Sequence, residues 1–273
     1  MSAGKEQFAQ LMRGPHEQLD LGLAALLIAQ EEYPDLDLDG YLRQLDDLGQ
    51  QARDRLTPDA PPDAAVEALS RLLSEEHGFR GNQDDYYDPR NSFLNDVLDR
   101  RAGIPISLAA VYVEVGRRAG LNVRGVGFPA HFLAEHRGVI FDPFNGGHIL
   151  SEGDCRALLL QMTGGSMDFQ PRFLEPTPTK HILARMLNNL KQIYLKARYY
   201  RKAVGIMDRL LLVNPISYGE LRDRGAVHAE LKQYAQAKAD FEAYLKQPHQ
   251  PEDASAVRRA LRNIDNVMTL MDD

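Results

Sequence analysis

The chain has 273 residues, more than one typical domain, so we expect two. Hydrophobic residues make up 44% and charged residues 26%, a composition that excludes a disordered protein and allows a buried core. The longest apolar run, Leu21 to Ala29, is too short to cross a bilayer, and the preceding residues lack the apolar stretch of a signal peptide. We therefore expect a cytoplasmic protein that does not enter a membrane.

Residues 15–30 carry leucines at helical spacing, and residues 37–56 repeat that pattern. Asp63 is expected to cap a third helix, which Gly78 ends. A turn-rich stretch over 81–89 then separates these helices from the next part of the chain. The first eighty residues are therefore expected to be helical.

Two further helices are expected over 91–101 and 107–118, separated by Gly103-Ile104-Pro105 because proline disfavours helix in the residue before it. The second is apolar on most of its faces, which places it in the middle of a domain. We expect short strands over 123–134 and 138–141, paired antiparallel through a turn at His136-Arg137-Gly138.

Asn145-Gly146-Gly147 predicts another turn, and Ser151 is expected to cap a helix over 151–163. Residues 171–178 are rich in proline and read as a linker. Cys155, the single cysteine, cannot form an internal disulfide, and its helical surroundings predict a buried, inert thiol.

The C-terminal part shows self-similarity at an offset of 34 residues. The pairs are Leu187 with Leu221, Tyr200 with Tyr234, Ala203 with Ala237, Met207 with Phe241, and Leu211 with Leu245. This spacing resembles the tetratricopeptide repeat, with Gly225 at the usual glycine of the second unit and Lys191 in its place in the first. We expect two degenerate repeats and a closing helix over 254–271; an ordinary helical bundle is the alternative.

The net charge of −7 is unevenly distributed. Residues 1–183 hold 17 basic and 28 acidic side chains, whereas residues 184–249 hold 12 basic and 6 acidic ones. The basic repeats are expected to bind an acidic protein or peptide partner or to dock on the first half, although solvated helix faces give the same pattern. Nucleic acid is not expected, because the acidic half repels phosphate and no reading motif is present.

The candidate chemical site combines Ser107 near the start of the buried helix, His131 in one expected strand and Asp142 after the next. In such a triad a histidine takes the proton of the nucleophile, and a carboxylate fixes the tautomer of the histidine. Each residue also has a structural interpretation: Ser107 as a helix cap, His131 as a histidine bonded to Asp142, and Asp142 as the start of a turn.

Asn91 and Asn95 lie four residues apart upstream of the site. Asn95 is a conceivable oxyanion donor, while surface or turn-binding amides are the favoured interpretation of both. His131, Glu135 and His136 do not suggest a metal site, because residues 131 and 136 of one strand point to opposite faces. We expect neither a metal nor a cofactor.

Three stretches give a specific resemblance: NSFLNDVLDRRAGIPISLAAVY, GFPAHFL and FDPFNGG. Over roughly residues 15–270 the chain resembles the SirB-type family, which joins a transglutaminase-like core to tetratricopeptide repeats. The resemblance implies a cysteine, a histidine and an aspartate acting together on acyl groups, and carried over by position these fall on Ser107, His131 and Asp142. It therefore implies that serine replaces the cysteine nucleophile.

The expected fold is α+β: a transglutaminase-like, papain-type core over residues 1–178, with a small antiparallel sheet on a central helix, and helical repeats over 179–273. Because a hydroxyl is far less acidic than a thiol, we expect a regulatory or protein-binding protein of weak or absent catalytic activity. The alternatives are a serine-dependent amidase, protease or acyltransferase that uses Ser107, His131 and Asp142, and a purely structural adaptor.

Overall fold

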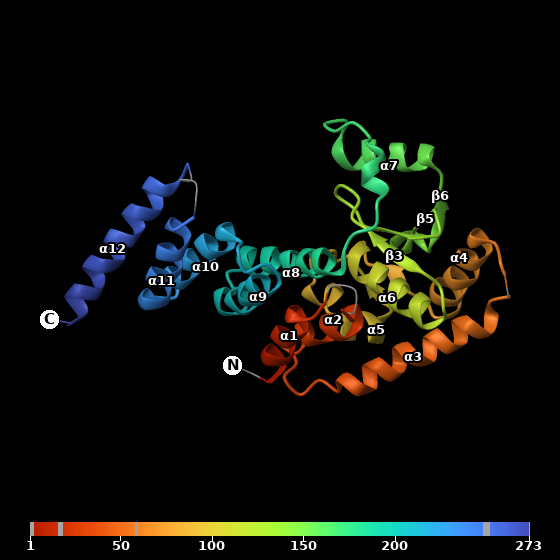
Figure 1. Ribbon diagram of the computed structural model, residues 1–273, viewed down its shortest axis with the longest axis horizontal. Helices are drawn as coiled ribbons and strands as arrows, with labels where there is room; N and C mark the ends of the chain where they lie inside the picture. The colour runs from red at the N-terminus through yellow and green to blue at the C-terminus, as the bar shows by residue number, and fades with distance from the viewer. Residues whose placement is uncertain (1–2, 16–18, 58, 248–251, 273) are drawn as a thin grey trace. The chain divides into compact units, whose positions relative to one another are not determined.

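The computed structural model describes residues 3–15, 19–57, 59–247 and 252–272 (Figure 1). The chain divides into two compact units, Met1–Met186 and Leu187–Asp273. The division falls within one helix, α8 (Thr179–Lys196), so the predicted boundary after residue 178 stays a prediction. Each unit is described by itself.

The first unit begins with three helices, α1 (Ala3–Arg13), α2 (Leu21–Ala29) and α3 (Leu38–Arg55). Asp20 caps α2 by accepting a hydrogen bond of 2.8 Å from the amide of Leu23, and Asp37 caps α3 in the same way. The expected helix over 15–30 thus begins at residue 21, while residues 16–18 lie outside the described part. Helix α1 lies within the first eighty residues, which were expected to be helical, although no separate helix was specified there.

The next helix, α4 (Pro62–Ser70), continues directly into a π-helix, η2 (Arg71–Glu76). The prediction that Asp63 caps this helix is wrong, because Pro61 occupies the N-cap position and Pro62 the first turn. The fixed φ angle of proline suits the first turn, and proline has no amide hydrogen to leave unpaired there.

A short 3-10 turn, η3 (Pro89–Asn91), precedes α5 (Leu94–Arg100) and the central helix α6 (Pro105–Arg118). Two-residue strands, β1 (Arg80–Gly81) and β2 (Ala102–Gly103), pair in parallel just before α6. Nearly all of α6 is buried, because α3 packs on one side of it and the sheet on the other (Figure 1). The prediction of a central apolar helix is confirmed.

The sheet has four antiparallel strands in chain order: β3 (Val123–Val126), β4 (Leu133–His136), β5 (Val139–Asp142) and β6 (His148–Leu150). The single strand expected over 123–134 is two strands, because residues 127–132 leave the sheet between them. Strand β6 was not predicted, since it is short and follows two glycines.

A 3-10 turn, η4 (Pro143–Asn145), follows β5, and α7 (Glu152–Thr163) follows β6. Ser151 caps α7 as expected, with its hydroxyl accepting from the amide of Asp154. Cys155 is buried among apolar side chains of the sheet and α7, and this burial raises the pKa of its thiol. The expected linker contains a further turn, η5 (Pro171–Leu174), and Pro176 bridges to Val126.

The second unit consists of antiparallel helices: α8 enters it, followed by α9 (Tyr200–Val213), α10 (Tyr218–Glu230), α11 (Tyr234–Leu245) and α12 (Ala254–Asp272). Helices α9 and α11 begin 34 residues apart, as the repeat offset predicts. Gly225 lets α10 approach α11, because a Cβ there would lie 2.9 Å from the ring of Phe241.

Lys191, at the other usual glycine position, is buried and forms an ion pair of 2.7 Å with Glu220. Arg224 binds both Asp208 and Asp240. Several basic residues of the repeats are therefore neutralised within the second unit.

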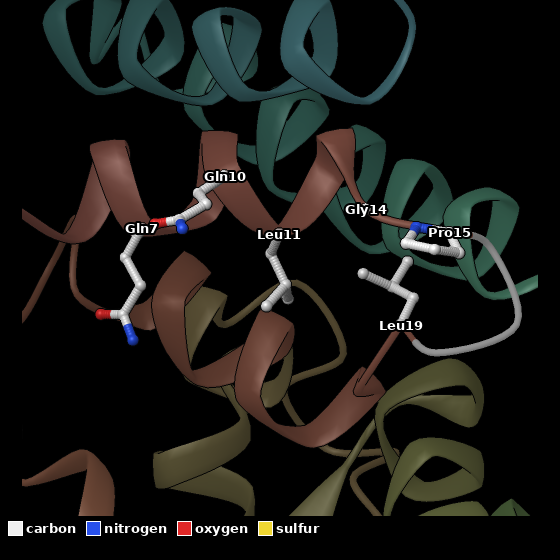
Figure 2. A pocket seen from close by; sticks show the side chains of 6 residues that line it. All are labelled: Gln7, Gln10, Leu11, Gly14, Pro15 and Leu19. Carbon is white, nitrogen blue, oxygen red and sulfur yellow. The ribbon is translucent and has the colours of Figure 1, made fainter.

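A cavity of about 340 Å³ adjoins α1. Gln7, Gln10 and Leu11 extend from the helix, and Pro15 and Leu19 lie close to each other beyond its end (Figure 2). It is an opening at the N-terminal helices and includes neither Ser107 nor His131. In the described part of the chain, no helix combines the length and the apolar character needed to span a membrane.

Candidate functional site

The histidine and the aspartate of the candidate triad meet. Asp142 is the last residue of β5, and His131 lies just before the neighbouring strand β4. The Nε2 atom of His131 is 2.9 Å from Oδ2 of Asp142, and both side chains are almost fully buried. Antiparallel pairing of β4 with β5 creates this contact between residues eleven positions apart.

The carboxylate of Asp142 accepts two further hydrogen bonds, from the amide of Phe144 at 3.0 Å and from Nδ2 of Asn145 at 2.7 Å. Burial by itself would raise the pKa of Asp142, but the hydrogen bond and charge of His131, together with these two donors, lower it overall. The site therefore holds an ionised carboxylate at neutral pH.

His131 is held by two hydrogen bonds of its backbone and by one further contact of its ring. Its amide donates to the carbonyl of Phe128, and its carbonyl accepts a hydrogen bond of 2.8 Å from Arg185 of α8. The ring of Phe144 stands edge-on to the imidazole, with the ring centroids 5.9 Å apart. Phe144 in turn contacts Tyr86, an exposed tyrosine of the turn-rich stretch.

Ser107 is not part of this pair. Its side chain is fully buried, and its Oγ atom lies 2.6 Å from the carbonyl oxygen of Asn91 and 3.1 Å from that of Ile104. Oγ also accepts a hydrogen bond from the amide of Ile104. Because a hydroxyl has one proton, the shorter contact shows that it is donated to Asn91.

Ser107 is the third residue of α6 and Ile104 is its N-cap, so the interpretation of Ser107 as the N-cap is wrong. Its hydroxyl still caps the first turn, because it accepts a hydrogen bond from the amide of Ile104. Among the described residues, its hydroxyl makes no hydrogen bond to His131. A serine nucleophile needs its general base within hydrogen-bonding reach. The structure thus joins two members of the candidate triad and ties the third to the backbone.

Asn91 is fully buried and connects several segments, a role that spacing alone did not indicate. Its Nδ2 donates to the carbonyls of Asp85 and Tyr86, and its Oδ1 accepts from Asn82. The expectation of a turn-binding amide is therefore confirmed for Asn91. A polar residue between a turn-rich stretch and a helix is the signal that could have identified it.

Asn95, the candidate oxyanion donor, is buried on α5. The expectation that its amide lies on the surface is wrong, because the residue is only 4% exposed. Its Oδ1 makes no hydrogen bond to any described residue. None of the contacts among the described residues places it beside His131.

Sequence reasoning also missed Asn145 and Arg185. Asn145 lies three residues after Asp142 in the FDPFN stretch, the spacing at which a turn side chain can return to an aspartate. Arg185 could not be found in this way, because it lies far along the chain on α8. Across the described residues, no cluster of three metal-ligating side chains is present.

Comparisons with known proteins agree with this architecture. Residues 39–188 match the family described as "Transglutaminase-like superfamily", and residues 190–262 match a tetratricopeptide repeat family. No solved structure gives a significant match.

A "UPF0162 protein" of Xylella fastidiosa is 36% identical over 257 residues, which cover 92% of each chain. A protein of the same name from Vibrio cholerae is 30% identical and covers 88% of this chain and 90% of that one. The mouse "F-box only protein 21" is 31% identical over 137 residues, 46% of this chain and 21% of its own length. The chain belongs to the transglutaminase-like superfamily and, within it, to the SirB-type UPF0162 family, in which this core is followed by tetratricopeptide repeats.

Proposed function

We propose that this protein is a regulatory, protein-binding member of its superfamily in which the candidate triad does not catalyse acyl transfer. The observation that carries this proposal is the position of the Ser107 hydroxyl, which is fully buried and donates to the carbonyl of Asn91. Attack on an acyl group would require this oxygen to leave its cap and reach His131.

The serine-dependent amidase, protease or acyltransferase remains the competing proposal, and the His131–Asp142 pair favours it. A buried aspartate that orients a histidine is one half of such a mechanism. This enzyme proposal is weaker than the regulatory one. A histidine–aspartate pair without a nucleophile in reach can bind a polar group but cannot form an acyl intermediate.

We propose that the helical repeats contact a partner. Where α8 ends and α9 begins, four basic residues are exposed around Tyr199, whose side chain is 59% exposed: Lys196, Arg198, Arg201 and Lys202. The ammonium group of Lys202 lies 5.8 Å from the centre of the Tyr199 ring. A basic surface with an accessible aromatic ring suits an acidic segment of a protein or peptide partner.

Capture of partners by the purified full-length chain, identified by mass spectrometry, tests this proposal. Arg198→Glu together with Arg201→Glu should abolish the capture of any specific partner, because both residues are exposed and their reversal repels an acidic segment. Lys191 is left unchanged, since its ion pair with Glu220 stabilises the repeats.

The matched control is Arg258→Glu with Arg259→Glu, which reverses the same charge at exposed positions of α12. Circular dichroism should show that both double variants are folded. Equal capture by the α8–α9 variant and the wild type would contradict the proposed acidic partner. Loss of partner capture in both double variants would show that overall charge, and not the α8–α9 surface, controls binding.

A further inference from the structure

A second cavity in the first unit, of about 380 Å³, is distinct from the site described above. It lies where three segments meet: the connection between α3 and α4, the residues that follow α6, and the hairpin between β4 and β5. Its volume falls in the lower range of small-molecule sites, which extends from about 300 Å³ upward. Neither His131 nor Asp142 lines it, so this inference goes beyond the proposed function.

His136, the last residue of β4, lines this cavity and is only 4% exposed. Its Nδ1 atom is enclosed and has no hydrogen-bond partner among the described residues, whereas Nε2, which has no partner among them either, is not enclosed. The residues directly opposite on the neighbouring strands are Val123 and Val139, whose side chains cannot supply one. A ligand in the cavity could therefore form a hydrogen bond with Nε2, the nitrogen that is not enclosed.

Glu135, the neighbour of His136 in β4, cannot serve this ring. Successive residues of a strand point to opposite faces, and the carboxylate of Glu135 already binds Arg124 and the amide of Gly138. None of these neighbouring side chains pairs with His136, so its accessible nitrogen is available to a ligand in the cavity.

The charges at the rim of the cavity have opposite signs. Arg137 follows His136 at the tip of the hairpin, and Asp59 lies on the α3–α4 connection. Both side chains are exposed, and in the described part of the chain neither forms an ion pair. Thr57 and Asn122 add neutral polar groups, while Ala60, Ala65, Ala119 and Leu121 supply apolar wall.

We propose that this cavity binds a small zwitterion that carries a carboxylate and an ammonium group, with the size and chemistry of a free amino acid. The carboxylate is held by Arg137 and the ring of His136, the ammonium group by Asp59, and the remainder lies against the alanines. A simple anion would face the charge of Asp59, and a simple amine would face that of Arg137. A few polar groups in a partly apolar cavity are typical of small-molecule sites.

The test is a titration of the full-length protein with free L-amino acids, followed by NMR through the imidazole resonances. The resonance of His136 is identified by its absence in His136→Gln. At least one amino acid should shift it saturably, while acetate and methylamine at the same concentration should not. An equal shift from acetate or methylamine would overturn the zwitterion, and no shift from any amino acid would overturn the site.

Substitutions at two exposed positions of the cavity test the site without removing a buried side chain. Asp59→Asn and Arg137→Asn should each weaken binding about tenfold or more, a loss of about 1.4 kcal/mol. Both positions have positive φ angles, of 60° and 48°, which asparagine tolerates. Asp47→Asn and His148→Gln change exposed residues outside the cavity and should leave binding unchanged. Equal weakening by the two controls would contradict the proposal.

Discussion

The first unit contains two clusters of buried polar side chains, and they use their hydrogen bonds differently. Ser107 bonds only to main-chain groups, those of Asn91 and Ile104, so its cluster fixes the backbone at the start of α6. Asp142 gathers two side chains and one amide around a carboxylate, so its cluster holds a negative charge in place. Residues in the chain order of a catalytic triad can therefore have two unrelated tasks.

The difference predicts how each cluster responds to substitution. Loss of a partner in the Ser107 cluster leaves main-chain groups unpaired, a cost that does not depend on pH near neutrality. Loss of a partner in the Asp142 cluster changes the stability of a charged state, and its effect must follow pH.

The largest effect is expected for Asn91→Ala, which removes the side chain that binds Asn82 and the carbonyls of the turn-rich stretch. We expect a loss of about 3 kcal/mol, because several buried groups are left without a partner. Urea unfolding measures it. Asn82→Ala, which loses this half-buried bond and an exposed one from the amide of Asp85, is the control and should cost about 1 kcal/mol. Equal losses in the two variants would contradict the central place of Asn91.

The second effect is expected for Asp142→Asn, with a loss of about 2 kcal/mol at neutral pH. Because the pKa of Asp142 is lower in the folded than in the unfolded chain, its ionisation stabilises the fold above the unfolded pKa. This contribution is lost as the pH falls below about 4 and through the folded pKa. The variant should therefore lose less stability in acid than the wild type, as urea unfolding across this range measures. Parallel pH curves would show that Asp142 holds no charge.

A smaller effect is expected for Ser107→Ala, about 1–2 kcal/mol, from loss of the cap and of the bond to Asn91. Thermal unfolding at neutral and mildly acidic pH should give the same loss at both. Ser151→Ala, which removes the exposed cap of α7, is the matched control and should cost about 1 kcal/mol or less. An unchanged stability of Ser107→Ala would exclude the structural task assigned to the hydroxyl.

The smallest effect is expected for Asn145→Ala, about 1 kcal/mol, because this donor to Asp142 is itself exposed. Its loss should move the pKa of Asp142 back toward the usual range, so that acid destabilises the variant at a higher pH than the wild type. Chemical unfolding across the acid range measures the shift. A shift in the opposite direction would mean that Asn145 does not favour the ionised carboxylate.

The sequence predicted the parts of the fold that depend on local chemistry. Helical spacing located α3, α6 and α12, the 34-residue offset located α9 and α11, and Ser151 located the start of α7. The strand β6 and the π-helix η2 were not predicted, because a three-residue strand and a change of helix type leave no periodic signal.

The candidate site shows the same limit. The turn between β4 and β5 was visible in the sequence, and with it the approach of His131 to Asp142. The partner of Ser107 was not, because Asn91 lies 16 residues away, before the helix α5 and the short strand β2. In the sequence, a serine at the start of a helix is consistent with a cap and with a nucleophile. Only the group that accepts its hydrogen bond, which the structure shows, distinguishes these two roles.

Labelling with a serine-directed phosphonate, followed by intact-mass measurement, tests most directly whether the Ser107 hydroxyl is held by its hydrogen bonds to the backbone and is therefore not a nucleophile. The folded wild type should acquire no adduct, and neither Ser107→Ala nor His131→Ala should change that result. A single adduct on the wild type that disappears in both variants would contradict the account, because it would require Ser107 to leave Asn91 and react with the help of His131.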